Sequence, residues 1–290
     1  MKLGSLVNRL SRGSLSRFGR KPEVEQRPEI LSGIRFPYGA FRFKSHIGQD
    51  VAFEILASSD LTNWQTIVAD TAPHDLVEYV DTDAHKFSCR FYRILVGSEY
   101  SENTFGYVTI TLPPGFSSIA NPLKSSAGTV GTLFADMPDG TKFHKFDPLN
   151  FVVTENGVSQ GKWARPSDRF LPGEGGIIFN PTSDYRPLSF VGNVMQGSIS
   201  TPIPSGFSMR SSLIPRPGRL MADLGFPAVE GDVIHLYDRD KQAYALYPYD
   251  PEKWAAESPV IGVAESFWVA KAVPGTWKQS LNLNMQTADV

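Results

Sequence analysis

Apolar and polar residues alternate through five short segments between residues 35 and 98, and turn-forming residues separate these segments. A period of two is typical of strands that bury one face, and clusters such as SSDLTN and DTDAHK are typical of the turns between strands. The pattern predicts a small antiparallel β-domain over residues 35–104. Its expected aromatic core comprises Phe53, Trp64, Tyr79, Phe91 and Tyr92.

Residues 1–34 carry a different pattern and are predicted to form a basic N-terminal arm. Its first apolar residues follow the i, i+3, i+4, i+7 spacing of an amphipathic helix, namely Leu3, Leu6, Val7 and Leu10. Three glycines in the same stretch oppose a helix, since each costs roughly 1 kcal/mol relative to alanine. The arm is therefore either a flexible segment or one that docks onto a neighbouring subunit, a membrane surface or an acidic polymer.

Charge is unevenly divided along the chain. Residues 1–22 carry six basic and no acidic residues, so the net charge of −2 leaves −8 on the remainder. Opposite charges favour docking of the arm on another copy, and head-to-tail docking generates rings or filaments. The expected docking residues are Arg9, Arg12, Arg17, Arg20 and Lys21. The negative net charge argues against nucleic acid as a partner.

One phrase occurs twice, as GTKFHKFD at residues 140–147 and as GDVIHLYD at residues 231–238. A shift of 91 residues aligns both phrases and, without a gap, many flanking residues. The aligned pairs include Gly115 with Gly206, Phe116 with Phe207, His144 with His235, Asp147 with Asp238, Trp163 with Trp254, and Glu174 with Glu265. We predict two copies of one supersecondary unit, at residues 105–197 and 198–277, followed by a C-terminal tail at 278–290.

The two predicted repeats are expected to pack about a pseudo-twofold axis into a β-sandwich or barrel-like domain. The predicted fold is therefore mainly β, and composition agrees, with 25 Gly, 22 Pro and 34 aromatic residues. Cys89 is the only cysteine, which excludes an internal disulfide and any zinc site with more than one thiolate. No apolar run approaches 18 residues, so no membrane-spanning helix is predicted.

Several phrases resemble proteins of Verrucomicrobia and Planctomycetes. ASSDLTNW, followed by YVD and RFYRILVG, is similar to a small β-module of large proteins from these bacteria. GYVTITLPPGFSSIANPL, LPGEGGIIFNP and SFVGNVMQGSISTPIPSGFSMRSSLIP resemble the C-terminal part of proteins from the same group. The resemblance implies an extracellular or cell-surface protein. The N-terminus has the basic start of a signal peptide but lacks its apolar stretch, so we expect either a cytoplasmic protein or one whose leader is missing or unconventional.

The repeated histidines, His144 and His235, have two interpretations. In one, the imidazoles meet near the pseudo-twofold axis and bind a metal together with repeated carboxylates, namely Asp147, Asp238, Glu174 or Glu265. In the other, which we favour, each imidazole satisfies a backbone group within its own repeat, because packing roles persist in both copies by default. No H-x-H or H-E-x-x-H spacing occurs, so neither a metal nor another cofactor is predicted.

The repeated glutamates could act as the acid and base of a sugar hydrolase. A glutamate before a strand more often caps backbone or pairs with a basic residue, and the sequence contains no phosphate loop or nucleophile elbow. We therefore predict no enzymatic activity. If the protein binds carbohydrate, the expected contacts are aromatic, namely Trp163, Trp254, Tyr247 and Tyr249.

These observations favour a non-enzymatic structural or interaction protein, an assembly subunit or surface component that self-associates through its basic arm. The alternative is a carbohydrate-binding β-module that contacts polysaccharide through exposed tryptophan and tyrosine.

Overall fold

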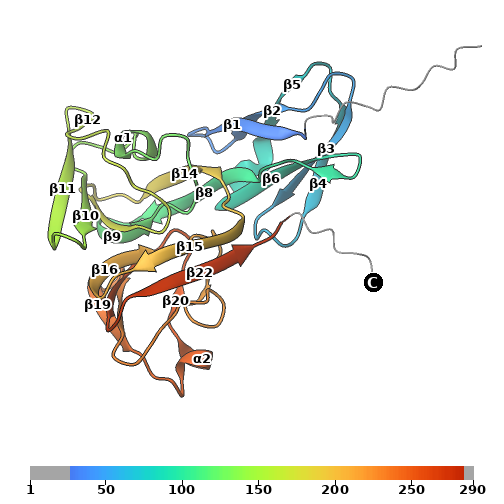
Figure 1. Cartoon of the computed structure of the whole chain (residues 1–290). Coiled ribbons are helices and arrows are strands. Elements are labelled where there is room, and N and C mark those ends of the chain that lie inside the picture. Colours follow the sequence, from blue (N-terminus) through green and yellow to red (C-terminus); the bar gives the residue numbers. More distant parts are fainter. Residues whose placement is uncertain (1–26, 284–290) are drawn as a thin grey trace, which may run out of the picture.

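A computed structural model describes residues 27–283, and strands make up most of this part of the chain (Figure 1). The predicted mainly β fold is confirmed, with several antiparallel sheets. Helix is confined to short turns, at η1 (Thr82–Lys86), α1 (Val130–Leu133) and α2 (Trp254–Glu257). Frequent glycine and proline keep the elements short, because both residues interrupt regular strands.

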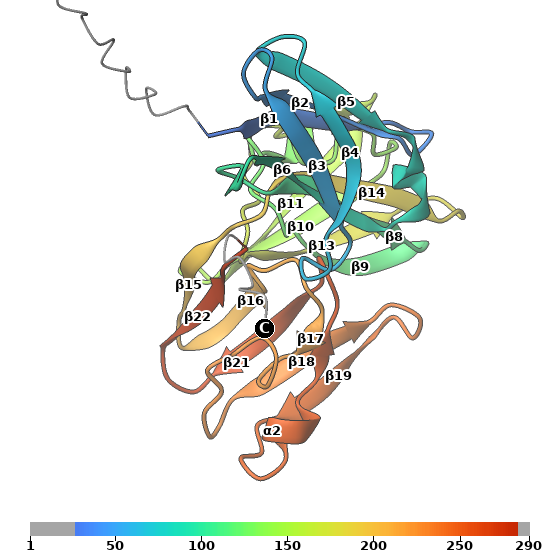
Figure 2. The ribbon, with the colours of Figure 1, turned by 90° about the vertical axis from the view of Figure 1, so that its right-hand side faces the viewer.

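Two sheets form the N-terminal part (Figure 2). The first has the order β1-β2-β5 and consists of β1 (Glu29–Arg35), β2 (Phe41–His46) and β5 (Leu76–Asp81). The second has the order β14-β8-β6-β3-β4, and β7 pairs with β6 at its side. Its strands are β3 (Ala52–Ser58), β4 (Gln65–Thr71), β6 (Cys89–Val96), β7 (Glu99–Tyr100), β8 (Phe105–Leu112) and β14 (Arg186–Asn193).

Several predicted boundaries differ from the element boundaries in the structure, and the predicted start of the C-terminal tail at residue 278 lies within the strand Gly275–Leu281. The arm is predicted to reach residue 34, yet β1 begins at Glu29, because Ile30 is buried and the strand pairs with β2 along its length. The predicted division between residues 104 and 105 lies within a continuous sheet, since β6 pairs with β8. The middle of β6 is buried on both faces, which favours a central position with strands on either side.

Aromatic rings from both N-terminal sheets form a shared core. The Tyr92 ring lies 5.3 Å from Phe41 and 4.9 Å from Phe43, measured between ring centroids. The Tyr92 hydroxyl donates to the buried carboxylate of Asp81 at 2.8 Å, and Arg90 forms an ion pair with the same carboxylate. Of the predicted core residues, three are buried and two are partly buried, namely Phe53, Phe91 and Tyr92, then Trp64 and Tyr79.

From β8 onward the chain forms two units of similar strand order, which we call the first unit (β8 to β14) and the second unit (β15 to β22); β8 and β14 also belong to the second N-terminal sheet. The first unit's five-stranded sheet has the order β12-β11-β10-β13-β9. Its strands are β9 (Gly115–Ala120), β10 (Lys142–Asp147), β11 (Val152–Ser159), β12 (Lys162–Trp163) and β13 (Gly175–Asn180). The second unit's four-stranded sheet has the order β16-β21-β18-β19. Its strands are β16 (Gly206–Ser211), β18 (Val233–Asp238), β19 (Ala243–Pro248) and β21 (Ser266–Lys271).

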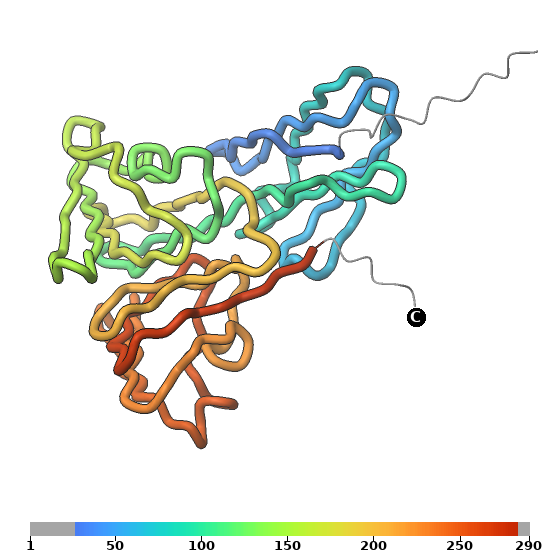
Figure 3. Tube along the Cα trace, viewed as in Figure 1, coloured from blue at the N-terminus to red at the C-terminus, as the bar shows by residue number. Residues whose placement is uncertain are grey.

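Each unit also pairs its first strand with its last. β8 pairs with β14 in the first unit, and β15 (Gly197–Ile203) pairs with β22 (Gly275–Leu281) in the second, where the two strands run side by side (Figure 3). Two short strands, β17 (Gly218–Arg219) and β20 (Val260–Ile261), pair with each other.

Residues 91 positions apart occupy corresponding places in the two units. Phe143 pairs with Ile178 in the first unit, and Ile234 pairs with Val269 in the second. Left-handed backbone conformations recur at the same offset, at Gly115 and Gly206, Gly140 and Gly231, Gly173 and Ala264, and Phe151 and Gln242.

Contacts between the two units are reciprocal. The backbone N–H of Ala120 donates to Ala264 O at 2.8 Å, and that of Ser211 donates to Gly173 O at 3.2 Å. The two donors, Ala120 and Ser211, are 91 residues apart, and so are the two acceptors, Gly173 and Ala264, so the two hydrogen bonds are equivalent. Exchange of partners of this kind is what a twofold axis produces between the subunits of a symmetric dimer.

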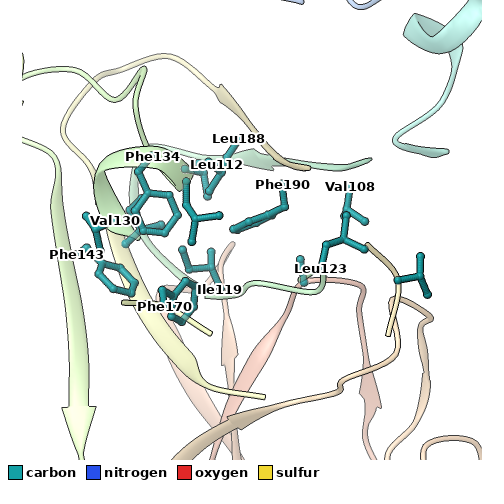
Figure 4. Close-up of a cluster of buried hydrophobic side chains, with 14 of the residues drawn as sticks. Val108, Leu112, Ile119, Leu123, Val130, Phe134, Phe143, Phe170, Leu188 and Phe190 are labelled. Atoms are coloured by element: carbon teal, nitrogen blue, oxygen red, sulfur yellow. The ribbon is translucent and has the colours of Figure 1, made fainter. Parts of the chain in front are cut away.

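The first unit supplies most of an apolar core, shown in Figure 4, to which Leu61 and Phe91 of the N-terminal part and Ala264 and Leu281 of the second unit also contribute. Phe134 lies near its centre, with ring centroids 5.1 Å from Phe143, 6.0 Å from Phe170 and 6.2 Å from Phe190. A separate core in the second unit includes Leu220, Phe226, Ile234, Phe267, Val269 and Trp277. Because strand residues alternate in direction, the core positions Phe143 and Ile234 leave the next residue of each strand, a histidine, on the opposite face.

Candidate binding groove between the two units

The repeated phrase specifies a strand and the hairpin turn that follows it. Through Oδ1, each terminal aspartate accepts hydrogen bonds from the backbone N–H groups two and three residues later, at 2.9 and 3.3 Å for Asp147 and at 3.1 and 3.0 Å for Asp238. Hydrogen bonds lower the pKa of both carboxyls, with the side chains of Asn150 and Lys241 as the largest causes. Both aspartates therefore act as turn caps.

The repeated glutamates hold the turns before β13 and β21. Glu174 Oε2 accepts the backbone N–H of Leu171, and Glu265 Oε2 accepts that of Gly262, each at 2.7 Å. Lys145 Nζ also donates to Glu174 at 2.8 Å. Burial raises the pKa of Glu265, while the hydrogen bond from Gly262 opposes the rise. Backbone capping, expected for a glutamate in this position, is thus the contact that both residues share.

The repeated histidines each pack beside the phenylalanine of a Gly-Phe-Ser turn. Ring centroids lie 6.2 Å apart for His144 and Phe116, and 5.6 Å apart for His235 and Phe207. Burial lowers the pKa of both imidazoles, so both are largely neutral at pH 7. His144 Nε2 is 3.9 Å from a carboxylate oxygen of Glu155 and has no hydrogen-bond partner in the described part of the chain, so the expected backbone contact is lacking at that atom.

No cluster of three or more His, Cys, Asp or Glu side chains within residues 27–283 has a geometry that could hold a metal ion. The carboxylates considered as companions of the histidines are occupied by the turn contacts described above.

Trp163 and Trp254, predicted as ligand contacts, lie inside the protein. They are 8% and 4% exposed, and each donates its Nε1–H to a backbone carbonyl, at 2.9 and 3.0 Å. A buried indole gains from its large apolar area when its N–H also finds an acceptor, and both conditions are met in the core. In this structure neither ring is available to a ligand. Tyr247 and Tyr249 are partly buried against the second unit's core.

Other aromatic residues converge where the two units meet, and we call this opening the aromatic groove. One part of it, about 320 Å³, is lined by Phe116, His144, Phe146, Val153 and Ile177 of the first unit and by Met209, Tyr237, Tyr244 and Trp268 of the second. An adjoining part of about 520 Å³ shares three of these residues and adds Phe151, Phe207 and His235. Phe146, Tyr244 and Trp268 belong to both parts.

The floor of the groove is a set of mutually contacting rings. The Phe146 and Trp268 rings meet edge to face, with centroids 4.9 Å apart, and Trp268 Nε1 donates to the Tyr244 hydroxyl at 3.1 Å. Tyr244 in turn contacts Tyr237, with a centroid distance of 5.0 Å. This network combines residues of both units, so the groove exists only when the units are packed together.

The rim of the groove exposes large apolar side chains. Phe116 is 41% exposed, Phe207 46%, Tyr244 41% and Phe151 67%. A single exposed apolar side chain is ordinary, but a contiguous group of them around a recess is typical of an interaction site.

Polar contacts across the interface between the two units fix the relative positions of the residues that line the groove. The Gln242 side chain accepts the backbone N–H of Phe116 at 3.0 Å and donates to its carbonyl at 3.1 Å. The Ser118 and Ser266 hydroxyls lie 2.8 Å apart, and Arg239 donates to Ser118 O. These bonds position the rim residue Phe116 from the opposite unit.

The sequence contains a signal for the groove in the aromatic residues that recur at the 91-residue offset. Phe116 and Phe207 align at the 91-residue offset, as do Phe146 and Tyr237, and the histidines share a strand face with the latter pair. Aromatic residues repeated on the face opposite the core positions are the feature that would have located the groove.

The predicted docking residues of the arm, Arg9, Arg12, Arg17, Arg20 and Lys21, lie outside the described residues. Between residues 27 and 283, no helix is long and apolar enough to cross a membrane. No protein-family model matches the chain, and no curated protein is significantly similar to it.

Proposed function

We propose that the protein is a non-enzymatic interaction protein, a subunit of an assembly, in which the aromatic groove of one copy receives the N-terminal arm of another. The observation that carries this proposal is the convergence of exposed aromatic side chains from both units on one apolar opening. The two units, in this proposal, are copies of one supersecondary unit whose packing creates the groove.

The arm offers chemistry that suits the groove. Its apolar residues at helical spacing can supply one apolar face, which is the usual occupant of an apolar groove. Fully extended, a segment of 22 residues spans at most about 75 Å, so a groove on a neighbouring copy is within reach. The charge of +6 on residues 1–22 against −8 on the remainder would accelerate and orient this association.

Carbohydrate binding is the weaker candidate. Sugar recognition combines ring stacking with many hydrogen bonds, whereas the groove offers few polar groups besides two imidazoles and two phenols. The rings of Tyr244 and Trp268 remain the surfaces on which such binding would depend. An extracellular or cell-surface location is a further proposal that rests on the family resemblance.

Light scattering after size exclusion, at low and high salt, tests the assembly. The full chain should form salt-sensitive species larger than a monomer, and a chain beginning at Pro22 should be monomeric. Phe116→Ser combined with Phe207→Ser should weaken assembly without removing the arm, because both side chains lie on the rim.

A matched control is Tyr185→Ser, which removes a ring that is 68% exposed and lies outside the groove. Assembly that survives in the double phenylalanine variant as well as in this control would refute docking in the groove. A full chain that is monomeric at every salt concentration would refute assembly altogether, and screening for polysaccharide binding, lost on Trp268→Ala, would then decide for the alternative.

A further inference from the structure

A second recess lies on the face of β18 opposite to His235. It has a volume of about 460 Å³, and its walls include Leu236, Ala245, Tyr247 and Glu265. A corresponding recess of about 380 Å³ in the first unit includes Lys145. The two recesses occupy equivalent places in the two units. Leu236, which lines the recess of the second unit, lies 91 residues after Lys145, which lines that of the first.

In the first unit, the chain itself supplies a cation to the recess. Lys145 Nζ donates to both carboxylate oxygens of Glu174 at 2.8 Å and to Arg169 O at 3.0 Å. The Glu174 carboxylate also accepts the N–H of Leu171, so it is satisfied by one ammonium and one backbone group.

In the second unit, the carboxylate is retained and the cation is missing. Glu265 accepts the N–H of Gly262, as Glu174 accepts that of Leu171, but Leu236 stands where the first unit has Lys145. No cation within residues 27–283 forms an ion pair with Glu265 at 4.0 Å or less. The recess is also larger than its counterpart.

Charge and aromatic walls favour a cationic occupant. Three carboxylates line the recess, those of Asp238, Asp240 and Glu265, against the guanidinium of Arg239, and Asp238 is already paired with Lys241 Nζ at 2.8 Å. Arg239 donates through Nη2 to Ser118 O at 3.2 Å, and its charge acts on Glu265 from beyond ion-pair distance. The Tyr247 ring, on the same face of the sheet as Leu236, can add cation–π attraction of about 0.5–2 kcal/mol.

We infer that this recess binds a primary alkylammonium group, from a free amine or a lysine side chain, with its nitrogen hydrogen-bonded to Glu265 in the place that Lys145 Nζ takes in the first unit. A four-carbon stem, as in lysine, would lie along Leu236 and Tyr247. The site is separate from the proposed docking of the arm, because the Tyr237 ring contacts Tyr244 in the aromatic groove, on the opposite face of β18 from Leu236.

Titration of the full chain with n-butylamine, followed by NMR of the Leu236 and Val263 methyl groups, tests the inference. We expect saturable shifts at these methyl groups, and n-butanol, which lacks the charge, should cause none. Glu265→Gln should weaken amine binding by at least about tenfold, because a charge-assisted hydrogen bond is lost. Parallel titration with Nα-acetyl-lysine methylamide separates the two sources of the group, since tighter binding of this compound would indicate a lysine side chain.

Two further variants exchange the residue types at the equivalent positions 145 and 236. Leu236→Lys should place an internal ammonium on Glu265 and abolish amine binding, and Lys145→Leu should create a second binding site in the first unit. The inference is overturned if n-butanol shifts the methyl signals as n-butylamine does, or if Leu236→Lys binds the amine as tightly as the unaltered protein.

Discussion

Replacement of Lys271 by methionine should destabilise the second unit by about 3–5 kcal/mol. Lys271 Nζ donates to Asp232 at 2.5 Å and to Pro227 O at 2.9 Å, and the paired side chains are only 1% and 0% exposed. Asp232 also accepts the backbone N–H groups of Val229 and Ala272. Without the ammonium, a buried carboxylate remains without a counterion, and breaking a buried ion pair in this way costs about 3–5 kcal/mol.

The first unit supplies a neutral version of the same position. At the 91-residue offset, Asn180 stands in the place of Lys271 and Thr141 in the place of Asp232. The Asn180 Nδ2 group donates to three backbone carbonyls, so it joins segments without any charge. Combining Lys271→Asn with Asp232→Thr should therefore recover at least about 2 kcal/mol relative to Lys271→Met, because no buried charge is left alone.

Urea unfolding measures these differences. Tryptophan fluorescence reports mainly on the second unit, which holds Trp254, Trp268 and Trp277, and a double-mutant cycle with Lys271→Asn and Asp232→Thr separates the pair interaction from the single losses. A loss below about 1 kcal/mol for Lys271→Met, or single losses that add without coupling, would refute the reasoning.

Three further predictions follow from residues of both units. Trp163→Ala should lower the free energy of unfolding by about 3–5 kcal/mol, because it empties part of the core, yet leave assembly unchanged; urea unfolding and light scattering check both effects. Burial raises the folded-state pKa of Glu265, so its contribution to stability should increase as pH falls toward 4.5, and thermal unfolding of Glu265→Gln should lack this increase. Burial lowers the pKa of His144, so stability should fall as pH drops below 6.5 toward the folded-state pKa, and His144→Phe should remove that dependence. Equal pH dependence in variant and unaltered protein would contradict either expectation.

Local sequence patterns predicted the strands well because each strand carries its own alternation. In GTKFHKFD, Phe143 and Phe146 break strict alternation because the strand is covered on both faces. Phe143 lies in the first unit's core and Phe146 lies in the groove. The pairing of β10 with β11 continues through both residues in regular register.

Pairing between distant strands and the exposure of individual side chains could not be predicted in the same way. β14 lies about 75 residues beyond β8 in sequence, and nothing in its residues specifies that it extends the sheet containing β6. Trp163 and Trp254 became candidate contacts by residue type alone, and their burial depends on neighbours from separate segments. The groove combines side chains of two units, so it requires their relative placement.

The pairing of β15 with β22 has a consequence during synthesis of the chain. Ile203 pairs with Gly275, so β15 has no partner strand until roughly 70 more residues have been synthesised. At a ribosomal rate of roughly 5–20 residues per second, this delay lasts about 4–14 s. During that interval the nascent segment exposes unpaired backbone groups, which are a template for aggregation. Pro202, which has no N–H to offer a foreign strand, protects the segment at the stage when the growing polypeptide is most vulnerable.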